Sequence, residues 1–174
     1  MRDSRKTILL TGATGNMGRE AVKRIAENAD ALRLRVFVRP EERSLPFVKS
    51  VMRGGLAEIH WGDLRDAKSV TEAVRDADIV LHVAALVSPL ADRTAPEIVD
   101  AVNVSGTHNI VEAIRASGRQ DDIRLVYVGS VAQTGGRNPP IHWSPRRRSD
   151  QDQPVRPLRP NQDARRSPGG RVRR

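Results

Sequence analysis

The sequence predicts an α/β fold in which a parallel sheet is covered by helices on both faces, a doubly wound arrangement. Three observations support this prediction. Short β-rich apolar runs alternate with segments of helical period, a glycine-rich turn directly follows the first run, and 174 residues are enough for one domain with a sizeable core. Such alternation is typical of parallel strands joined by right-handed helical crossovers.

Five apolar runs predict the strands, and the segments between them predict the helices. The expected strands are residues 7–11, 33–38, 57–61, 78–84 and 123–129. The expected helices are residues 16–27, 44–53, 67–75 and 96–117, the last of which has a long apolar face. Strands with this spacing favour the sheet order 3-2-1-4-5, in which a ligand crevice opens between strands one and four at their carboxyl ends.

Net charge divides the chain into two parts. The whole chain carries +9, but residues 1–136 carry only +1, whereas residues 137–174 hold eleven Arg and three Asp and carry +8. The same segment contains seven of the eleven prolines and shows almost no apolar periodicity. We therefore expect one α/β domain over residues 1–136 and an irregular, basic tail over residues 137–174.

Composition argues against several classes of site and partner. The chain has no cysteine, so we expect no disulfide, no metal site and a reducing, cytoplasmic environment. The longest apolar run, residues 79–87, is too short to span a bilayer, and the first residues lack the apolar stretch of a signal peptide, so we expect a soluble protein without a membrane partner. Nucleic-acid binding by the basic tail is the weaker alternative, because Trp143 is its only aromatic residue for base stacking.

The first strand leads directly into the motif Gly12-x-x-Gly15-x-x-Gly18, and the first helix begins inside it. Glycine permits positive φ values and close approach of the backbone to a pyrophosphate, while the new helix offers free N–H groups to phosphates. A glycine-rich turn without a ligand is the alternative, but the position after a strand and before a helix favours a dinucleotide site of the Rossmann type. The residues expected to contact the dinucleotide are Gly12, Thr14, Gly15, Asn16, Met17 and Gly18.

The residues around these glycines, Thr-Gly-Ala-Thr-Gly-x-x-Gly at 11–18, resemble the opening of the extended short-chain dehydrogenases/reductases. That group contains NAD-dependent epimerases and dehydratases and hydroxysteroid dehydrogenases. Four further matches follow in the order of the family, and they are Gly62-Asp63-Leu64, His82-Val83-Ala84-Ala85, Asn103-Val104-x-Gly106-Thr107 and Val126-Tyr127-Val128-Gly129-Ser130. The resemblance covers about the first three quarters of the chain and implies an NAD(P)-binding Rossmann domain.

The resemblance also implies roles for particular residues. Taken alone, each polar member has a structural alternative as a turn cap, a local hydrogen-bond partner in a helix or a turn residue. His82, on an apolar strand, is expected to be a satisfied core histidine with no role in proton transfer. The implied roles are Asp63 and Leu64 beside the adenine, Ala84 and Ala85 along the cofactor, Asn103 as a structural Asn of the cofactor site, and Ser130 as the catalytic serine.

The end of the second strand bears on the choice between NAD and NADP. A carboxylate there would bind the adenosine ribose hydroxyls and repel a 2′-phosphate, but this sequence has Arg39. A guanidinium at Arg39, aided by Arg43, would form charge-assisted hydrogen bonds to the 2′-phosphate, which favours NADP. Glu41 and Glu42 weaken this argument, and a solvated arginine is the alternative.

The chain lacks the residue pair that transfers protons in this family. Relatives have a Tyr-x-x-x-Lys pair about two dozen residues beyond the serine, whereas the only tyrosine here, Tyr127, precedes Ser130 and all four lysines lie far upstream. Read one nucleotide late, codons permitted for residues 158–163 can spell Tyr-Ala-Arg-Thr-Lys, so truncation or a frameshift after about residue 143 is one hypothesis for the tail. We expect the chain as written to be catalytically incomplete.

The sequence leaves two main functions open. The first is an NAD(P)-dependent oxidoreductase or epimerase/dehydratase, in incomplete form, that acts on a carbinol or carbonyl group. The second is a non-catalytic NADP-sensing regulatory module, since some relatives bind the cofactor without the Tyr-Lys pair. The small-molecule substrate stays unidentified, because the residues that select it lie mainly beyond the resemblance, and a homodimer is compatible with the sequence.

Overall fold

The structure is a computed structural model that describes residues 5–130 of the 174-residue chain. The chain divides into two units, Met1–Val128 and Gly129–Arg174, and the sheet with its helices belongs to the first. The predicted domain boundary at residue 136 and the predicted irregular tail lie outside the described residues. Within residues 5–130, no helix is both long and apolar enough to cross a membrane.

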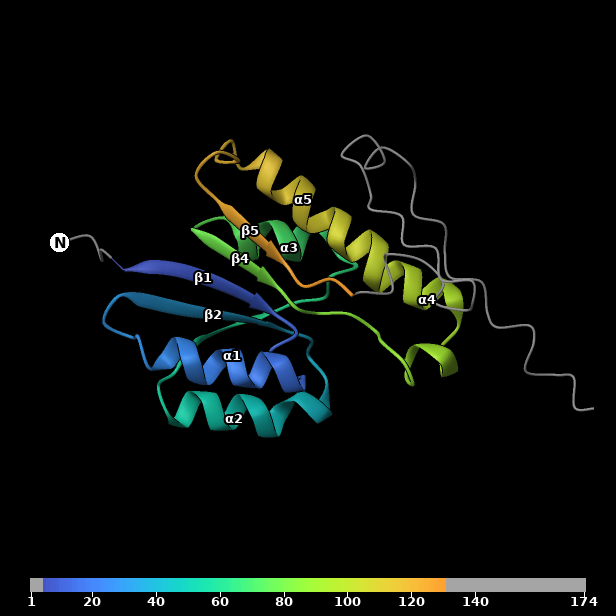
Figure 1. The fold of residues 1–174 in the computed structure, drawn as a ribbon, viewed down its shortest axis with the longest axis horizontal. Coiled ribbons are helices and arrows are strands. Elements are labelled where there is room, and N and C mark those ends of the chain that lie inside the picture. Colours follow the sequence, from blue (N-terminus) through green and yellow to red (C-terminus); the bar gives the residue numbers. More distant parts are fainter. Residues whose placement is uncertain (1–4, 131–174) are drawn as a thin grey trace, which may run out of the picture. The chain divides into compact units, whose positions relative to one another are not determined.

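Five parallel strands form one sheet in the order β3-β2-β1-β4-β5, which confirms the predicted topology (Figure 1). The central strand β1 places Thr11 level with Phe37 of β2 on one side and with His82 of β4 on the other. The loops that follow β1 and β4 therefore leave the carboxyl edge of the sheet next to each other. The strands are β1 (Lys6–Thr11), β2 (Leu32–Val38), β3 (Glu58–Trp61), β4 (Ile79–His82) and β5 (Arg124–Tyr127).

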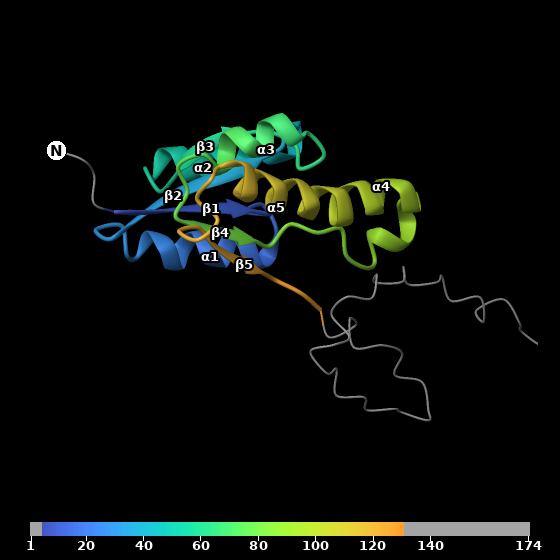
Figure 2. The same ribbon diagram turned by 90° about the horizontal axis from the view of Figure 1, so that it is seen from above.

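Helices cover both faces of the sheet, as the doubly wound prediction requires (Figure 1, Figure 2). On one face lie α1 (Asn16–Ala26) and α2 (Leu45–Arg53), and on the other lie α3 (Ala67–Val74) and α5 (Gly106–Ala116). The first three predicted helices agree with α1, α2 and α3 to within one residue at each end. Shorter helical segments complete the connections, namely η1 (Glu42–Ser44), η2 (Ala91–Arg93), α4 (Pro96–Asp100) and the π-helical turn η3 (Ala101–Ser105).

The core consists of two apolar layers, one on each face of the sheet. Along β1 the side chains alternate between them, because Ile8 and Leu10 pack with α1 and α2 while Leu9 packs with α3 and α5. Val36 of β2 and Ile110 of α5 are completely buried in these layers. Burying one such side chain contributes about 1.5–3 kcal/mol, so the central strands hold the carboxyl edge of the sheet firmly in place.

The second half of the chain holds the predicted elements that differ from those observed. The strand predicted for residues 78–84 ends at His82, because the Ala84 N–H donates to the Thr11 hydroxyl at 3.2 Å instead of continuing the ladder. The helix predicted for residues 96–117 consists of the three segments α4, η3 and α5. The middle segment is a π-helical turn, a feature that often occurs near functional sites.

β5 lies at the edge of the sheet. It ends at Tyr127, two residues before the predicted end at residue 129, and among the described strands it pairs only with β4. All four of its residues are exposed, including Leu125, Val126 and Tyr127. The outer backbone groups of β5 therefore have no strand partner in the described part of the chain.

Candidate functional site

The glycine-rich loop of residues 11–18 leaves β1 and enters α1 beside the end of β4. Gly12 has a φ of +73°, which L side chains rarely adopt, and a Cβ placed there would lie 2.6 Å from the Ala84 amide nitrogen. The Gly15 N–H donates to the Gly12 carbonyl at 3.0 Å and closes the turn. Gly12 therefore brings together two more of the predicted cofactor residues, Gly15 and Ala84.

The three glycines of the loop differ in what surrounds them. Gly18 is buried, and a Cβ there would lie 2.1 Å from the Gly12 carbonyl oxygen, so α1 can approach the loop only without a side chain. Gly15 is exposed with a φ of −77°, and an added Cβ would meet only that same oxygen, at 3.4 Å. Packing within the protein thus requires Gly12 and Gly18, whereas the fold itself does not require glycine at position 15.

The N-terminus of α1 is open to an anion. Gly15 is its N-cap residue and offers no side-chain hydrogen bond, and the first turn contains no acidic residue. The first N–H groups of a helix carry partial positive charge and lack partners within the helix. By contrast, α3 is capped by Asp66, whose carboxylate accepts from Lys68 N at 3.1 Å and from Ser69 N at 3.3 Å. An anion above the loop would therefore find donors at α1.

The remaining predicted residues of the loop lie on its outer side. Thr14, Asn16 and Met17 are exposed, and Met17 keeps 60% of its surface accessible. The Thr14 carbonyl accepts from Arg19 Nε at 2.9 Å, and the Arg19 guanidinium lies 5.7 Å from the centre of the Phe47 ring. Arg19 thereby attaches the loop to α2.

A chain of hydrogen bonds joins the loop to the helix beyond β4. The Ala84 N–H donates to Thr11 Oγ1 at 3.2 Å, and Thr11 Oγ1 lies 2.7 Å from His82 Nδ1. Across the ring, His82 Nε2 lies 3.0 Å from Thr107 Oγ1, which donates to the Asn103 carbonyl at 2.7 Å. Thr107 uses its one hydroxyl proton for the Asn103 carbonyl, so it must accept from the Nε2–H of the His82 ring. In this tautomer Nδ1 carries no proton, and it accepts from the Thr11 hydroxyl.

His82 is a neutral core histidine, as the sequence predicted. It is 1% exposed, and burial lowers the pKa of its imidazole to about 4. A second proton, on Nδ1, would point at the Thr11 oxygen and displace the proton that Thr11 now donates. His82 therefore orients the two threonines.

Asn103 anchors the segment that follows β4. The Leu86 N–H donates to Asn103 Oδ1 at 2.7 Å, and Asn103 Nδ2 donates to the Leu86 carbonyl at 2.9 Å. Asn103 belongs to the π-helical turn η3, so this turn is tied to the same segment that carries Ala84 and Ala85. Asn103 thus fixes the position of this segment, and its role in a cofactor site stays a prediction.

A second group of predicted residues lies at the carboxyl ends of β2 and β3. Arg39 Nη1 lies 3.0 Å from Glu41 Oε1, and Arg43 pairs with the other oxygen of that carboxylate. Asp63 accepts from Arg65 Nη2 at 2.6 Å, and the side-chain hydrogen bond from Arg65 holds the pKa of Asp63 below its ordinary value. The charge of Arg39 also lowers the pKa of Asp63, so the charged residues at the ends of β2 and β3 form one cluster.

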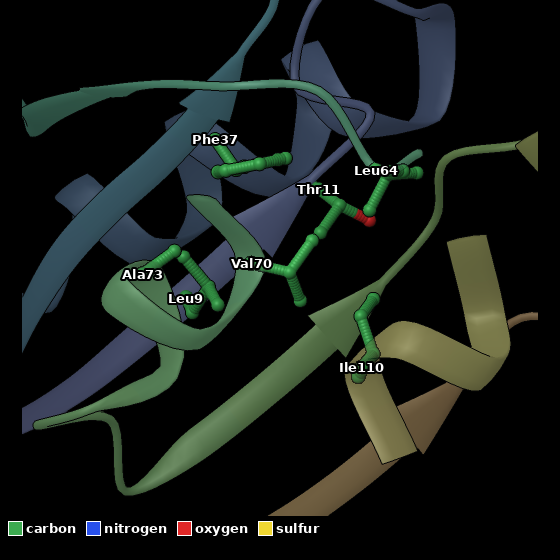
Figure 3. Close-up of a pocket in the computed structure, with 7 residues that line it drawn as sticks. All are labelled: Leu9, Thr11, Phe37, Leu64, Val70, Ala73 and Ile110. Atoms are coloured by element: carbon green, nitrogen blue, oxygen red, sulfur yellow. The ribbon is translucent and has the colours of Figure 1, made fainter. Parts of the chain in front are cut away.

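Leu64 contributes its side chain to the core. It is 7% exposed, and its carbonyl accepts from Asn109 Nδ2 at 2.8 Å. Contact between Leu64 and a nucleotide would therefore come from its backbone. Figure 3 shows Leu64 among the side chains around a small gap, which are Leu9, Thr11, Phe37, Leu64, Val70, Ala73 and Ile110. The gap has no room for a water molecule, so it belongs to the core and is not a ligand site.

The predicted catalytic serine, Ser130, is exposed and belongs to the second unit, Gly129–Arg174. Its catalytic role stays a prediction. Sequence reasoning also left Thr11, Thr107 and Arg65 without a role, although all three lie within or beside the matched motifs. The roles of these residues depend on contacts between positions far apart in the sequence. Thr11 and His82, for example, are 71 positions apart.

The chain is similar to proteins of a known family. The model of the NAD dependent epimerase/dehydratase family matches residues 8–163. Among curated proteins, UDP-N-acetylglucosamine 4,6-dehydratase (inverting) of Campylobacter jejuni is 30% identical over 123 residues, and human 3 beta-hydroxysteroid dehydrogenase type 7 is 31% identical over 148 residues. These matches cover 70% and 84% of this chain but 36% and 37% of the relatives. The chain thus spans less than half the length of these relatives.

Solved structures show the same similarity. Uronate dehydrogenase from Agrobacterium tumefaciens matches with a TM-score of 0.52 and 26% identity, over 75% of this chain and 42% of that one. A variant of that enzyme complexed with NAD matches with a TM-score of 0.51 and 27% identity over the same shares. The sheet and helices described above are therefore shared with a protein whose structure contains a bound nicotinamide dinucleotide.

Proposed function

Because the chain belongs to the NAD-dependent epimerase/dehydratase family, we propose that it binds an NAD(P) cofactor over the glycine loop of residues 11–18. We further propose that the cofactor serves an oxidoreductase or epimerase/dehydratase reaction at a carbinol or carbonyl group of a small molecule. The similarity to a dehydrogenase complexed with NAD supports the first proposal. The dehydratase and hydroxysteroid dehydrogenase relatives support the second.

The observation that carries the proposal is the difference between Gly15 and its two neighbouring glycines. Packing accounts for Gly12 and Gly18, but Gly15 is exposed and has space for a Cβ. A pyrophosphate lying against the backbone at Gly15 would account for the lack of a side chain at this exposed position. The uncapped N-terminus of α1 supplies N–H donors for the charge of the pyrophosphate.

The charged cluster beyond β2 supports a preference for NADP over NAD. Arg39 and Arg43 both point a guanidinium at one carboxylate, so both are placed to bind one further anion such as a 2′-phosphate. Glu41 neutralises part of their charge. We therefore expect a moderate preference, on the order of tenfold in Kd, which corresponds to one charge-assisted hydrogen bond.

Isothermal titration calorimetry tests both parts of the cofactor proposal. NADP⁺ is expected to bind about tenfold more tightly than NAD⁺, and Arg39→Gln should remove most of that difference without changing the affinity for NAD⁺. Arg53→Gln, at the exposed end of α2, is the matched control for the loss of one arginine. Absence of binding of either nucleotide would contradict the proposal, whereas a preference for NAD⁺ would contradict only the role of Arg39.

When bound, the nicotinamide would donate or accept a hydride. From this chain, Ser130 would hold the substrate oxygen through its hydroxyl. The 174 residues contain no Tyr-x-x-x-Lys pair, so the chain lacks the group that exchanges a proton with substrate in this family. We therefore propose that the chain as written binds the cofactor without turnover.

The missing pair also favours a second candidate function, a non-catalytic NADP-sensing module. The nucleotide sequence around the codon for Trp143 separates the two candidates. A frameshift at that point would favour the enzyme, because codons permitted for residues 158–163 can spell a Tyr-x-x-x-Lys pair when read one nucleotide late. An intact frame together with NADP binding would favour the sensing module.

A further inference from the structure

Arg19, the fourth residue of α1, holds one peptide unit of the glycine loop. Its Nε–H donates to the Thr14 carbonyl at 2.9 Å. The other end of the same peptide unit, the Gly15 N–H, donates to the Gly12 carbonyl at 3.0 Å. Because a peptide unit is planar, hydrogen bonds at both of its ends fix the orientation of its plane. The Thr14 oxygen is therefore kept facing the guanidinium of Arg19.

The guanidinium of Arg19 is supported by the core. Its central carbon lies 5.7 Å from the centre of the Phe47 ring. Phe47 is 7% exposed and belongs to the apolar layer that joins α1 and α2 to the sheet. A guanidinium can interact with an aromatic ring and still donate through Nε, whereas the ammonium group of a lysine offers no donor at that position. The arrangement therefore requires an arginine and not simply a positive charge.

No carboxylate balances the charge of Arg19. The N-terminus of a helix carries partial positive charge, so a cation near the first turn of α1 is unfavourable there. That turn contains no acidic residue, and within residues 5–130 Arg19 forms no ion pair, whereas Arg24 of the same helix pairs with Glu20 and Glu27. An anion above the glycine loop would offset the charge that the free protein leaves unbalanced.

We propose that Arg19 is a positioning residue for the cofactor, an inference that rests on the proposed binding of NAD(P). Arg19 turns the Thr14 carbonyl away from the place of the pyrophosphate, which that oxygen would repel, and so holds the loop ready to bind. Affinity falls in proportion to the fraction of molecules in the binding conformation. Loss of the Arg19 bond therefore weakens NAD and NADP alike, because both contain the pyrophosphate.

Calorimetry with NADP⁺ and NAD⁺ on Arg19→Lys and Arg19→Gln tests the inference. Lysine keeps the charge but lacks the Nε donor, so both variants should raise both Kd values about tenfold and leave their ratio unchanged within about twofold. Arg24→Lys and Arg24→Gln are the matched controls, because Arg24 is an exposed arginine of the same helix without a bond to the loop. Their Kd values should stay within about twofold of the wild type.

Two further measurements separate positioning from general stability. Without nucleotide, hydrogen exchange at the Gly15 amide should accelerate in Arg19→Lys, because only one end of its peptide unit is still held. Phe47→Leu should raise the NADP⁺ Kd about threefold in the wild type and leave that of Arg19→Lys unchanged, since the ring acts through the guanidinium.

The possible outcomes separate this inference from the proposal beneath it. Wild-type affinity in Arg19→Lys, or an equal loss in Arg24→Lys, would overturn the role of Arg19 and leave the proposed function intact. A loss confined to NADP⁺ would also overturn it, because Arg19 would then act on the 2′-phosphate and not on the loop. Failure of the wild-type protein to bind either nucleotide would overturn both.

Discussion

A Cβ atom at Gly18 would lie 2.1 Å from the Gly12 carbonyl oxygen, whereas a Cβ at Gly15 would lie 3.4 Å from the same atom. Gly18→Ala is therefore expected to destabilise the protein by about 3 kcal/mol, because backbone atoms must move. Gly15→Val should stay within about 1 kcal/mol of the wild-type stability and yet abolish binding of NADP⁺, since the side chain fills the space of the pyrophosphate. Urea unfolding and calorimetry measure the two effects. NADP⁺ binding by a folded Gly15→Val variant would contradict the proposed site.

His82 gives the stability a dependence on pH. Its pKa is about 4 in the folded protein against 6.5 in the unfolded chain, so between these values only the unfolded chain takes up the proton. The contribution of neutral His82 to stability is complete above pH 6.5 and is lost as the pH falls toward 4. Between pH 7.5 and pH 5 the loss should be about 2 kcal/mol.

Urea unfolding at several pH values measures this loss. His82→Gln should flatten the dependence by the same amount, because the amide does not titrate in this range. His108→Gln, which removes an exposed imidazole from α5, controls for the loss of a histidine. An equal pH dependence in wild type and His82→Gln would show that the buried imidazole is not the group responsible.

At the scale of elements, the π-helical turn η3 and the segment after β4 are joined through one side chain. Asn103→Ala removes both hydrogen bonds to Leu86 and leaves two backbone groups without that partner, which should cost about 2–3 kcal/mol. Asn109→Ala removes a single bond, to the Leu64 carbonyl, and should cost about half as much. Hydrogen exchange at the Leu86 amide should accelerate in Asn103→Ala alone. Equal exchange in both variants would argue against the anchoring role.

Most elements could be predicted because a buried parallel strand appears in the sequence as a short apolar run and a covering helix as a 3.6-residue period. The break in the long predicted helix could not be predicted, because a π-helical turn is defined by i→i+5 backbone hydrogen bonds, which the pattern of apolar residues does not specify. The end of β4 was also missed. It depends on the bond between Ala84 N–H and Thr11 Oγ1, which forms only when β1 and β4 are adjacent.

The same distinction applies to the candidate site. The glycine loop could be predicted because its chemistry is local, a strand followed by small residues and a helix. The pairing of Glu41 with Arg39 and Arg43, and the chain from Thr11 to Thr107 through His82, required the folded structure. A sequence shows which charged groups and hydroxyls are present, but not which of them form ion pairs or hydrogen bonds with one another.

At the scale of the whole molecule, we expect the 174-residue chain to show no oxidoreductase turnover. General acid–base catalysis typically contributes about 10²–10⁴-fold, so loss of the Tyr-Lys pair alone should make activity hard to detect. A full-length version read one nucleotide late after Trp143 should be active. NADPH oxidation at saturating cofactor, with aldehydes, ketones and nucleotide sugars, compares the two. Comparable turnover by the chain as written would mean that other residues transfer the proton.

The exposed edge strand β5 has a consequence for the behaviour of the protein in concentrated solution. An edge that presents Leu125, Val126 and Tyr127 beside backbone groups with no strand partner within residues 5–130 is a template onto which a strand of another molecule can add. We expect aggregation that increases with protein concentration and that light scattering detects. Val126→Lys, which places a charge on the edge, should raise the concentration at which scattering begins. An unchanged onset would mean that β5 is not the surface through which molecules associate.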